Sequence, residues 1–66
     1  MLCEYDVIVL LHAQNEVPIA AGTRGTILID HNTSPPAYEV EFVDEAGKSL
    51  GIFSILGKNM QIASDA

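Results

Sequence analysis

The sequence predicts a small all-β domain built from five short strands. Runs of β-branched and aromatic residues alternate with clusters of Gly, Pro, Asn, Asp and Ser, which is the pattern of strands separated by turns. No stretch keeps a helical spacing of apolar residues over three turns. A chain of 66 residues has room for one hydrophobic core, so residues 1–66 are expected to form a single domain.

Five segments carry the strand pattern, and turn signals separate them. Strands are expected over residues 5–11, 25–30, 37–43, 50–55 and 60–62, with a tight helical turn over residues 56–59 and a frayed tail over residues 63–66. Pro18 and Gly22 limit any helix in the long first connector, residues 12–24, to one turn. Gly47 is the expected positive-φ residue of the hairpin after the third strand. A long first connector and a helical turn before the fifth strand are the order typical of SH3-like barrels.

Alternation along the strands predicts which side chains face the core. In the third strand, Tyr38, Val40 and Phe42 share one face and are expected inside, whereas Glu39 and Glu41 are expected outside. In the first strand, Asp6 is charged, so the face that it shares with Ile8 and Leu10 is expected to lie outside. The same rule then places Val7, Val9, Ile27 and Ile29 inside and leaves Ile8, Leu10 and Leu28 outside.

The outward apolar residues predict a contact surface. The fourth strand repeats the pattern, with Leu50 and Ile52 on one face and Phe53 and Ile55 on the other. Because contiguous exposed apolar patches usually mark interfaces, the sequence predicts an interface formed by Ile8, Leu10, Leu28 and Ile52. The alternative is that the connector covers these residues with Val17 and Ile19.

Composition narrows the classes of partner. Nine acidic and three basic residues give a net charge of −6, which opposes binding to nucleic acid or to an anionic membrane surface. No apolar run approaches the roughly 18 residues of a membrane helix. The N-terminus has no positive region, and Glu4 and Asp6 interrupt its apolar run, so no export signal is expected. Cys3 is the single cysteine, which rules out an internal disulfide and leaves the cytoplasm as the expected compartment.

No group of residues forms a recognisable catalytic, metal or cofactor site. Gly22 and Gly25 suit either a backbone nest for an anion or a tight turn with a close backbone approach, and the turn is favoured. His12 and His31 could meet at strand ends, but zinc needs three or four ligands. Cys3 lies beside carboxylates that oppose formation of its thiolate. An acidic stripe of Glu39, Glu41, Asp44 and Glu45 is either a solvated face or a docking surface for a basic segment.

Three motifs carry a resemblance to a known family. They are Glu4-Tyr5-Asp6 before an apolar run, Gly22 through Ile27, and Tyr38 through Phe42 followed by the Asp44–Gly47 hairpin. In these the chain closely resembles a family of small bacterial proteins known as a domain of unknown function. The resemblance spans nearly the whole chain. It implies an SH3-like barrel and no activity.

Two further groups are more distantly similar. The β-subunit of nitrile hydratase shares the outline of Asp6-Val7, the paired glycines and the strand from Tyr38 to Phe42. Because the metal ligands of those enzymes lie on the other subunit, this similarity implies a structural or accessory role. KOW domains also pass through a glycine turn into a strand, but they are normally basic, unlike this chain.

These observations favour a non-enzymatic protein-interaction or scaffold module without cofactors, working as a homo-oligomer, with a dimer favoured. The alternative is an accessory subunit or small acidic partner of another protein, such as a metalloenzyme or a toxin. Nucleic-acid binding ranks below both because of the charge, and enzymatic activity ranks last because no acid–base pair is evident.

Overall fold

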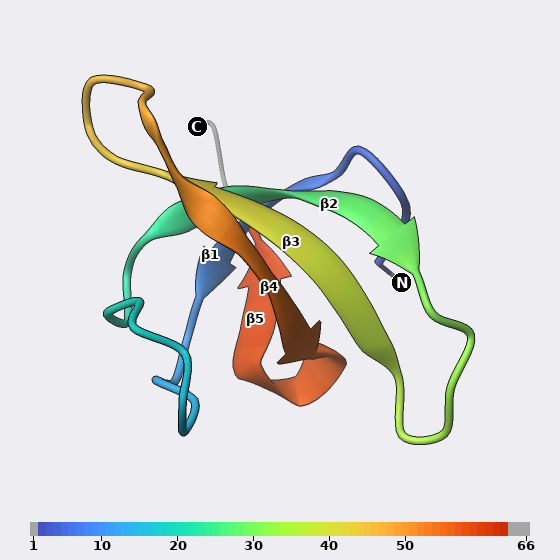
Figure 1. Cartoon of the computed structure of the whole chain (residues 1–66). Helices are drawn as coiled ribbons and strands as arrows, with labels where there is room; N and C mark the ends of the chain where they lie inside the picture. The colour runs from blue at the N-terminus through green and yellow to red at the C-terminus, as the bar shows by residue number, and fades with distance from the viewer. Residues whose placement is uncertain (1, 64–66) are drawn as a thin grey trace.

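The computed structural model describes residues 2–63, which form one antiparallel sheet (Figure 1). Its elements in chain order are β1 (Val7–Leu10), β2 (Arg24–Asp30), β3 (Ala37–Val43), β4 (Ser49–Leu56), the 3-10 turn η1 (Gly57–Asn59) and β5 (Met60–Ile62). The predicted all-β class, the five strands and the helical turn before the last strand are confirmed. Residues 64–66 of the expected tail lie outside the described residues.

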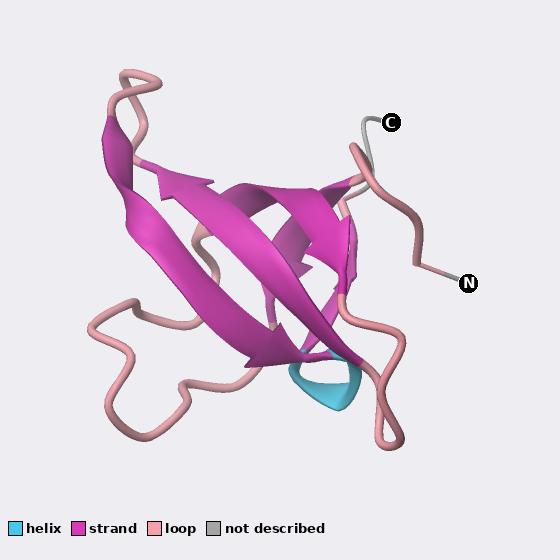
Figure 2. Cartoon of the chain, turned by 45° about the vertical axis from the view of Figure 1, so that its right-hand side comes forward, coloured by secondary structure: helices cyan, strands magenta, loops and turns pink. Residues whose placement is uncertain are grey.

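The strand order in the sheet is β4-β3-β2-β1-β5, so β4 and β5 are its two edges. Each neighbouring pair is antiparallel. In both views β1 and β5 lie behind β3 and β4, so the sheet curls over on itself (Figures 1 and 2). The chain passes from β4 to β5 through η1, which lies at one end of the curled sheet (Figure 2).

The core fills the inside of this curl. All five strands and the connector contribute to one buried apolar cluster: Ile8, Leu10, Ile19, Ile27, Tyr38, Val40, Phe42, Ile55 and Met60. Leu2, Val17 and Phe53 pack against it. The inward face predicted for the third strand is confirmed. Fully burying an aliphatic side chain contributes about 1.5–3 kcal/mol, so this cluster is the main source of stability.

The faces predicted for the first strand are wrong. Ile8 and Leu10 are 0% and 1% exposed, whereas Val7 is 42% exposed and Val9 is half-buried. The error comes from Asp6, which is not part of the strand. Its carboxylate accepts a hydrogen bond from the backbone N–H of Cys3 at 2.8 Å, and Tyr5 before it has a φ of 71°. Asp6 therefore belongs to a turn and does not set the alternation of β1.

The inward position predicted for Ile29 is also wrong. Ile27 lies opposite Val40 and is fully buried, but the next pair is Ile29 with Glu39, so Leu28 is an extra residue in β2. Such a β-bulge shifts the alternation by one position. Ile29 consequently lies on the outer face and is half exposed, while Leu28 is half-buried.

The fourth strand and the connector follow the sequence pattern more closely. Leu50 and Ile52 are exposed, Ile55 is buried and Phe53 is half-buried, as their alternation predicts. Ile19 of the connector is a core residue. The connector therefore helps to fill the inside of the curl. No helix in the described part of the chain is long and apolar enough to cross a membrane.

Candidate interaction surface

The four residues predicted to form an interface have different surroundings in the structure. Ile8 and Leu10 lie in the core and are inaccessible to a partner. Leu28 is half-buried at the bulge of β2. Ile52 is 52% exposed. The sequence-predicted patch is therefore not contiguous, and among its four members Ile52 is the exposed one.

Other apolar side chains are exposed in their place. The large ones are Tyr5, Val7, Leu11, Ile29, Leu50, Ile52 and Ile62. The register places Val7, Thr26, Glu41 and Ile52 in one row across the sheet. Glu41 lies between the apolar ends of this row. The outer face thus carries separate aliphatic contacts divided by the carboxylates of β3.

The strand β4 differs from the rest of the outer surface. Its eight residues, Ser49–Leu56, include no charged side chain and no proline. It pairs with β3 on one side, and no second strand lies along its other side within residues 2–63. Leu50 and Ile52 are both exposed on it. We call the exposed segment from Leu50 to Ser54, with its backbone edge, the β4 edge.

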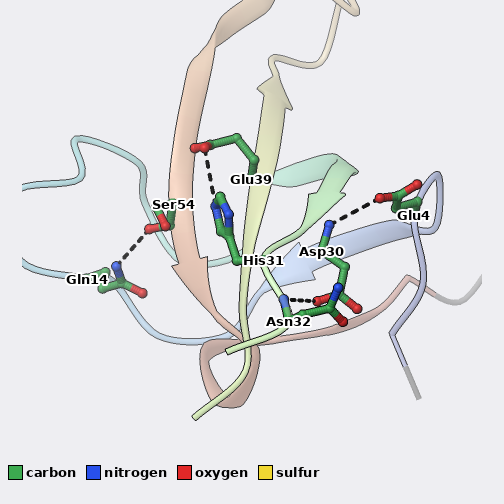
Figure 3. Close-up of polar contacts among 7 residues, drawn as sticks. All are labelled: Glu4, Gln14, Asp30, His31, Asn32, Glu39 and Ser54. Carbon is green, nitrogen blue, oxygen red and sulfur yellow. Dashed lines mark hydrogen bonds and ion pairs between the residues drawn. The ribbon is translucent and has the colours of Figure 1, made fainter. Parts of the chain in front are cut away.

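One side chain from the connector reaches the far end of β4. The Gln14 amide donates from Nε2 to the carbonyl oxygen of Ser54 at 3.0 Å (Figure 3). Its Oε1 accepts from the backbone N–H of Leu56 at 3.1 Å and from Nδ2 of Asn59 at 2.9 Å. One donor and one acceptor of the amide thus pair with the strand as a neighbouring peptide unit would. Gln14 occupies the end of the edge next to η1.

No pattern in the sequence predicts the contact between Gln14 and Ser54. Gln14 lies in an irregular connector, and it meets Ser54 across 40 positions of chain. A lone glutamine carries no spacing that predicts a strand-end contact. The contact depends on how the connector folds against β4.

The acidic stripe is engaged in local contacts. Glu39 Oε2 lies 3.3 Å from Nε2 of His31 (Figure 3), and Glu41 accepts from the Ser49 hydroxyl at 2.9 Å. Asp44 Oδ1 accepts from the backbone N–H groups of Ala46 and Lys48, which shapes the hairpin. These bonds give Glu39, Glu41 and Asp44 local structural partners.

Gly22, near the end of the connector, and Gly25, near the start of β2, are both required by the local structure. Gly22 has a φ of 92°, a backbone conformation that favours glycine. Gly25 is buried in β2, where a Cβ would lie 2.8 Å from Cγ1 of Val40 and 2.9 Å from the carbonyl oxygen of Glu41. Positive φ and close backbone approach are the two features that the turn interpretation predicted.

An open groove lies between the end of the connector and the β3–β4 hairpin. Its volume is about 540 Å³, and its lining consists of Ala21, Gly22, Thr23, Arg24, Val43, Asp44, Glu45 and Leu50. Both charge signs are present. Its apolar lining includes Leu50, which joins the groove to the β4 edge.

Within residues 2–63 no group of three or more His, Cys, Asp or Glu side chains is arranged to hold a metal ion. Cys3 is an exposed free thiol. Burial, with smaller contributions from the charges of Asp30 and Cys3, raises the pKa of the Tyr38 phenol above its ordinary value of 10.0. This shift follows from packing in the core.

Comparison with known proteins identifies a family but no individual relative. No curated protein and no solved structure matches the chain. The model of a family described as a domain of unknown function (DUF4926) matches residues 4–62, which is most of the chain. The chain belongs to this family of small domains.

Proposed function

We propose that this chain is a non-enzymatic protein-interaction module that self-associates, with a dimer favoured, and that the β4 edge makes the contact. The observation that carries the proposal is an eight-residue edge strand without charge and with Leu50 and Ile52 exposed. Long, flat, apolar edges are templates for pairing with another chain. Exposed apolar residues on them mark interaction sites.

Comparison of the two edges supports this choice. Proteins protect edge strands by making them short or by placing charges and prolines on them. The other edge, β5, has only three residues, Met60–Ile62. β4 is long and carries neither kind of protection on its side chains. In a chain with a net charge of −6, an uncharged strand is also where two copies approach with little repulsion.

The finer fold assignment belongs to the same proposal. We assign the curled sheet to the SH3-like barrels. The strand order β4-β3-β2-β1-β5 and the 3-10 turn between β4 and β5 support this assignment. The resemblance of the chain to small bacterial domains with that fold also supports it. The barrel serves as a scaffold that holds β4 rigid through its pairing with β3.

Solution mass tests the self-association. Size-exclusion chromatography with light scattering, at concentrations up to several hundred micromolar, is expected to give a dimer mass. Ile52→Asp is expected to return the mass to that of a monomer with the fold retained. Ile29→Asp is the matched control, because Ile29 is 50% exposed but lies on β2, two strands away from β4. A monomer at every concentration would falsify the proposal.

An accessory role is the second candidate function. The groove beside the hairpin supports it, because its lining places the carboxylates of Asp44 and Glu45 next to the aliphatic side chain of Leu50. The occupant would be a basic segment of another protein, such as a metalloenzyme or a toxin. This candidate requires co-purification of one specific protein with the wild-type chain and loss of it from Glu45→Lys. If the same protein co-purifies with both the wild-type chain and Glu45→Lys, the groove has no role in binding it.

A further inference from the structure

The backbone of β4 has a fixed pattern of free and occupied groups. The carbonyl oxygen of Ser54 and the N–H of Leu56 point away from β3, because both bond to the Gln14 amide. Backbone groups of alternate residues in a strand point to the same side. The N–H and C=O of Ile52 and the N–H of Ser54 therefore face the same open edge.

Gln14 limits how a second strand can pair there. An antiparallel partner centred on Phe53 would need the Ser54 carbonyl, which already accepts from Gln14 at 3.0 Å. A partner centred on Ile52 pairs through the N–H and C=O of Ile52 itself, and it leaves the Gln14 contact in place when the regular pairing stops before Leu50 of one copy reaches Ser54 of the other. Toward the hairpin, the register shift at Leu50 and the φ of 126° at Gly51 end the regular edge.

We infer that two copies of this chain join by antiparallel β4–β4 pairing, with Ile52 of one copy opposite Ile52 of the other on a two-fold axis. This inference rests on the proposed self-association and specifies its geometry. In a two-fold contact the same patch must complement itself. An antiparallel edge does so, because each Ile52 donates its N–H to the Ile52 carbonyl of the other copy.

Two further features fit a second copy as the occupant. β4 carries no charge, so the contact brings no carboxylates of the two acidic chains together along the paired strands. The Ile52 side chains, which are 52% exposed in the single copy, become neighbours across the axis. The result is a continuous sheet of two five-stranded halves.

Disulfide trapping tests the register. Opposed residues in a hydrogen-bonded antiparallel pair have Cα atoms about 5.5 Å apart, within the range of about 4.4–6.8 Å that a disulfide spans. Ile52→Cys, in a Cys3→Ser background that removes the native thiol, is expected to oxidise to a covalent dimer. Ser54→Cys in the same background is the matched control. Ser54 is exposed on the same strand but would lie about 13 Å from its counterpart, at roughly 3.3 Å per residue.

Amide hydrogen exchange of the wild-type chain gives a second measurement that needs no substitution. Raising the concentration from the monomer range to the dimer range is expected to slow exchange of the Ile52 amide at least tenfold. A dimer mass without protection of the Ile52 amide and without an Ile52→Cys cross-link overturns the pairing but leaves the proposed self-association standing. A dimer with a Ser54→Cys cross-link instead overturns the register. A monomer at all concentrations overturns both the β4–β4 pairing and the proposed self-association.

Discussion

Leu10 and Leu11 are adjacent leucines with opposite surroundings. Leu10 is 1% exposed in the core of the curled sheet, and Leu11 is 38% exposed after the end of β1. Leu10→Ala removes buried atoms and leaves a cavity, so it is expected to lower the free energy of unfolding by about 2–5 kcal/mol. A chain of this length has about 3–10 kcal/mol in total.

Leu11→Ala is the matched control and is expected to cost less than about 1 kcal/mol, as most exposed substitutions do. Urea denaturation followed by circular dichroism measures both values. Equal losses for the two variants would contradict the inward position of Leu10. A larger loss for Leu11→Ala would restore the alternation that the position of Asp6 suggested.

Ionisation of Tyr38 makes the free energy of unfolding depend on pH under alkaline conditions. Burial, assisted by the charges of Asp30 and Cys3, raises the pKa of its phenol above 10.0. Above that pH the unfolded chain loses the phenolic proton while the folded chain keeps it. The stabilising contribution is therefore complete below about pH 10 and is lost as the pH rises through the folded-state pKa.

Tyr38→Phe removes this ionisation and is expected to flatten the fall in stability above pH 10. Urea midpoints measured between about pH 8 and pH 11 test it. Tyr5→Phe serves as the control, because Tyr5 is 76% exposed, and this variant is expected to keep the wild-type slope. If Tyr38→Phe loses stability with pH as steeply as the wild type, another group dominates the alkaline unfolding.

At the scale of elements, the strands themselves could be predicted from sequence, but two of their faces could not. Residues 37–43 alternate without interruption, so the period alone correctly predicts that Tyr38, Val40 and Phe42 face the core. In β1 a single charge, Asp6, was used to choose the face, and that residue belongs to a preceding turn. In β2 the bulge at Leu28 reverses the alternation, and no glycine or proline marks the bulged residue.

The exposed residues of the candidate contact surface were predictable only in part, for related reasons. The exposure of Ile52 follows from the alternation of the fourth strand, which no bulge interrupts between Ile52 and Ile55. Which strands form the edges depends on their order in the sheet, and a single sequence does not contain that order explicitly. The Gln14 contact with Ser54 depends in addition on the path of the connector.

Gln14 fastens the connector to β4 and η1, and its loss should be felt mainly there. Its amide makes three hydrogen bonds, to Ser54, Leu56 and Asn59. At about 0.5–1.5 kcal/mol for each net hydrogen bond, the loss of three such bonds in Gln14→Ala is expected to cost roughly 1.5–4.5 kcal/mol. Exchange of the Leu56 amide should accelerate more than exchange of amides in the β2–β3 pair.

Gln14→Glu separates the roles of the two ends of the amide. Glutamate keeps an oxygen for Leu56 and Asn59 but places a second oxygen near the Ser54 carbonyl in place of the donor. We expect Gln14→Glu to have a free energy of unfolding at pH 7 between that of the wild type and that of Gln14→Ala. Uniform acceleration of exchange across the sheet in either variant would contradict a local role for Gln14.

At the scale of the whole molecule, the net negative charge opposes self-association, whereas the uncharged β4 edge favours it. Two copies of a chain with a net charge of −6 repel each other, while the proposed contact at β4 contains no ion pair that salt could weaken. The Debye length falls from about 30 Å at 0.01 M salt to about 10 Å at 0.1 M. Self-association is therefore expected to tighten several-fold as NaCl rises from about 20 mM to about 300 mM.

A complex with a basic partner has the opposite dependence, because salt weakens attraction between unlike charges. Light scattering over a dilution series at each NaCl concentration gives the dimer Kd directly. NaCl is preferred to sulfate, which strengthens apolar burial by itself. Weakening of the dimer by NaCl would mean that ion pairs hold the copies together, and since β4 has no charged side chain, the contact would then lie elsewhere on the surface.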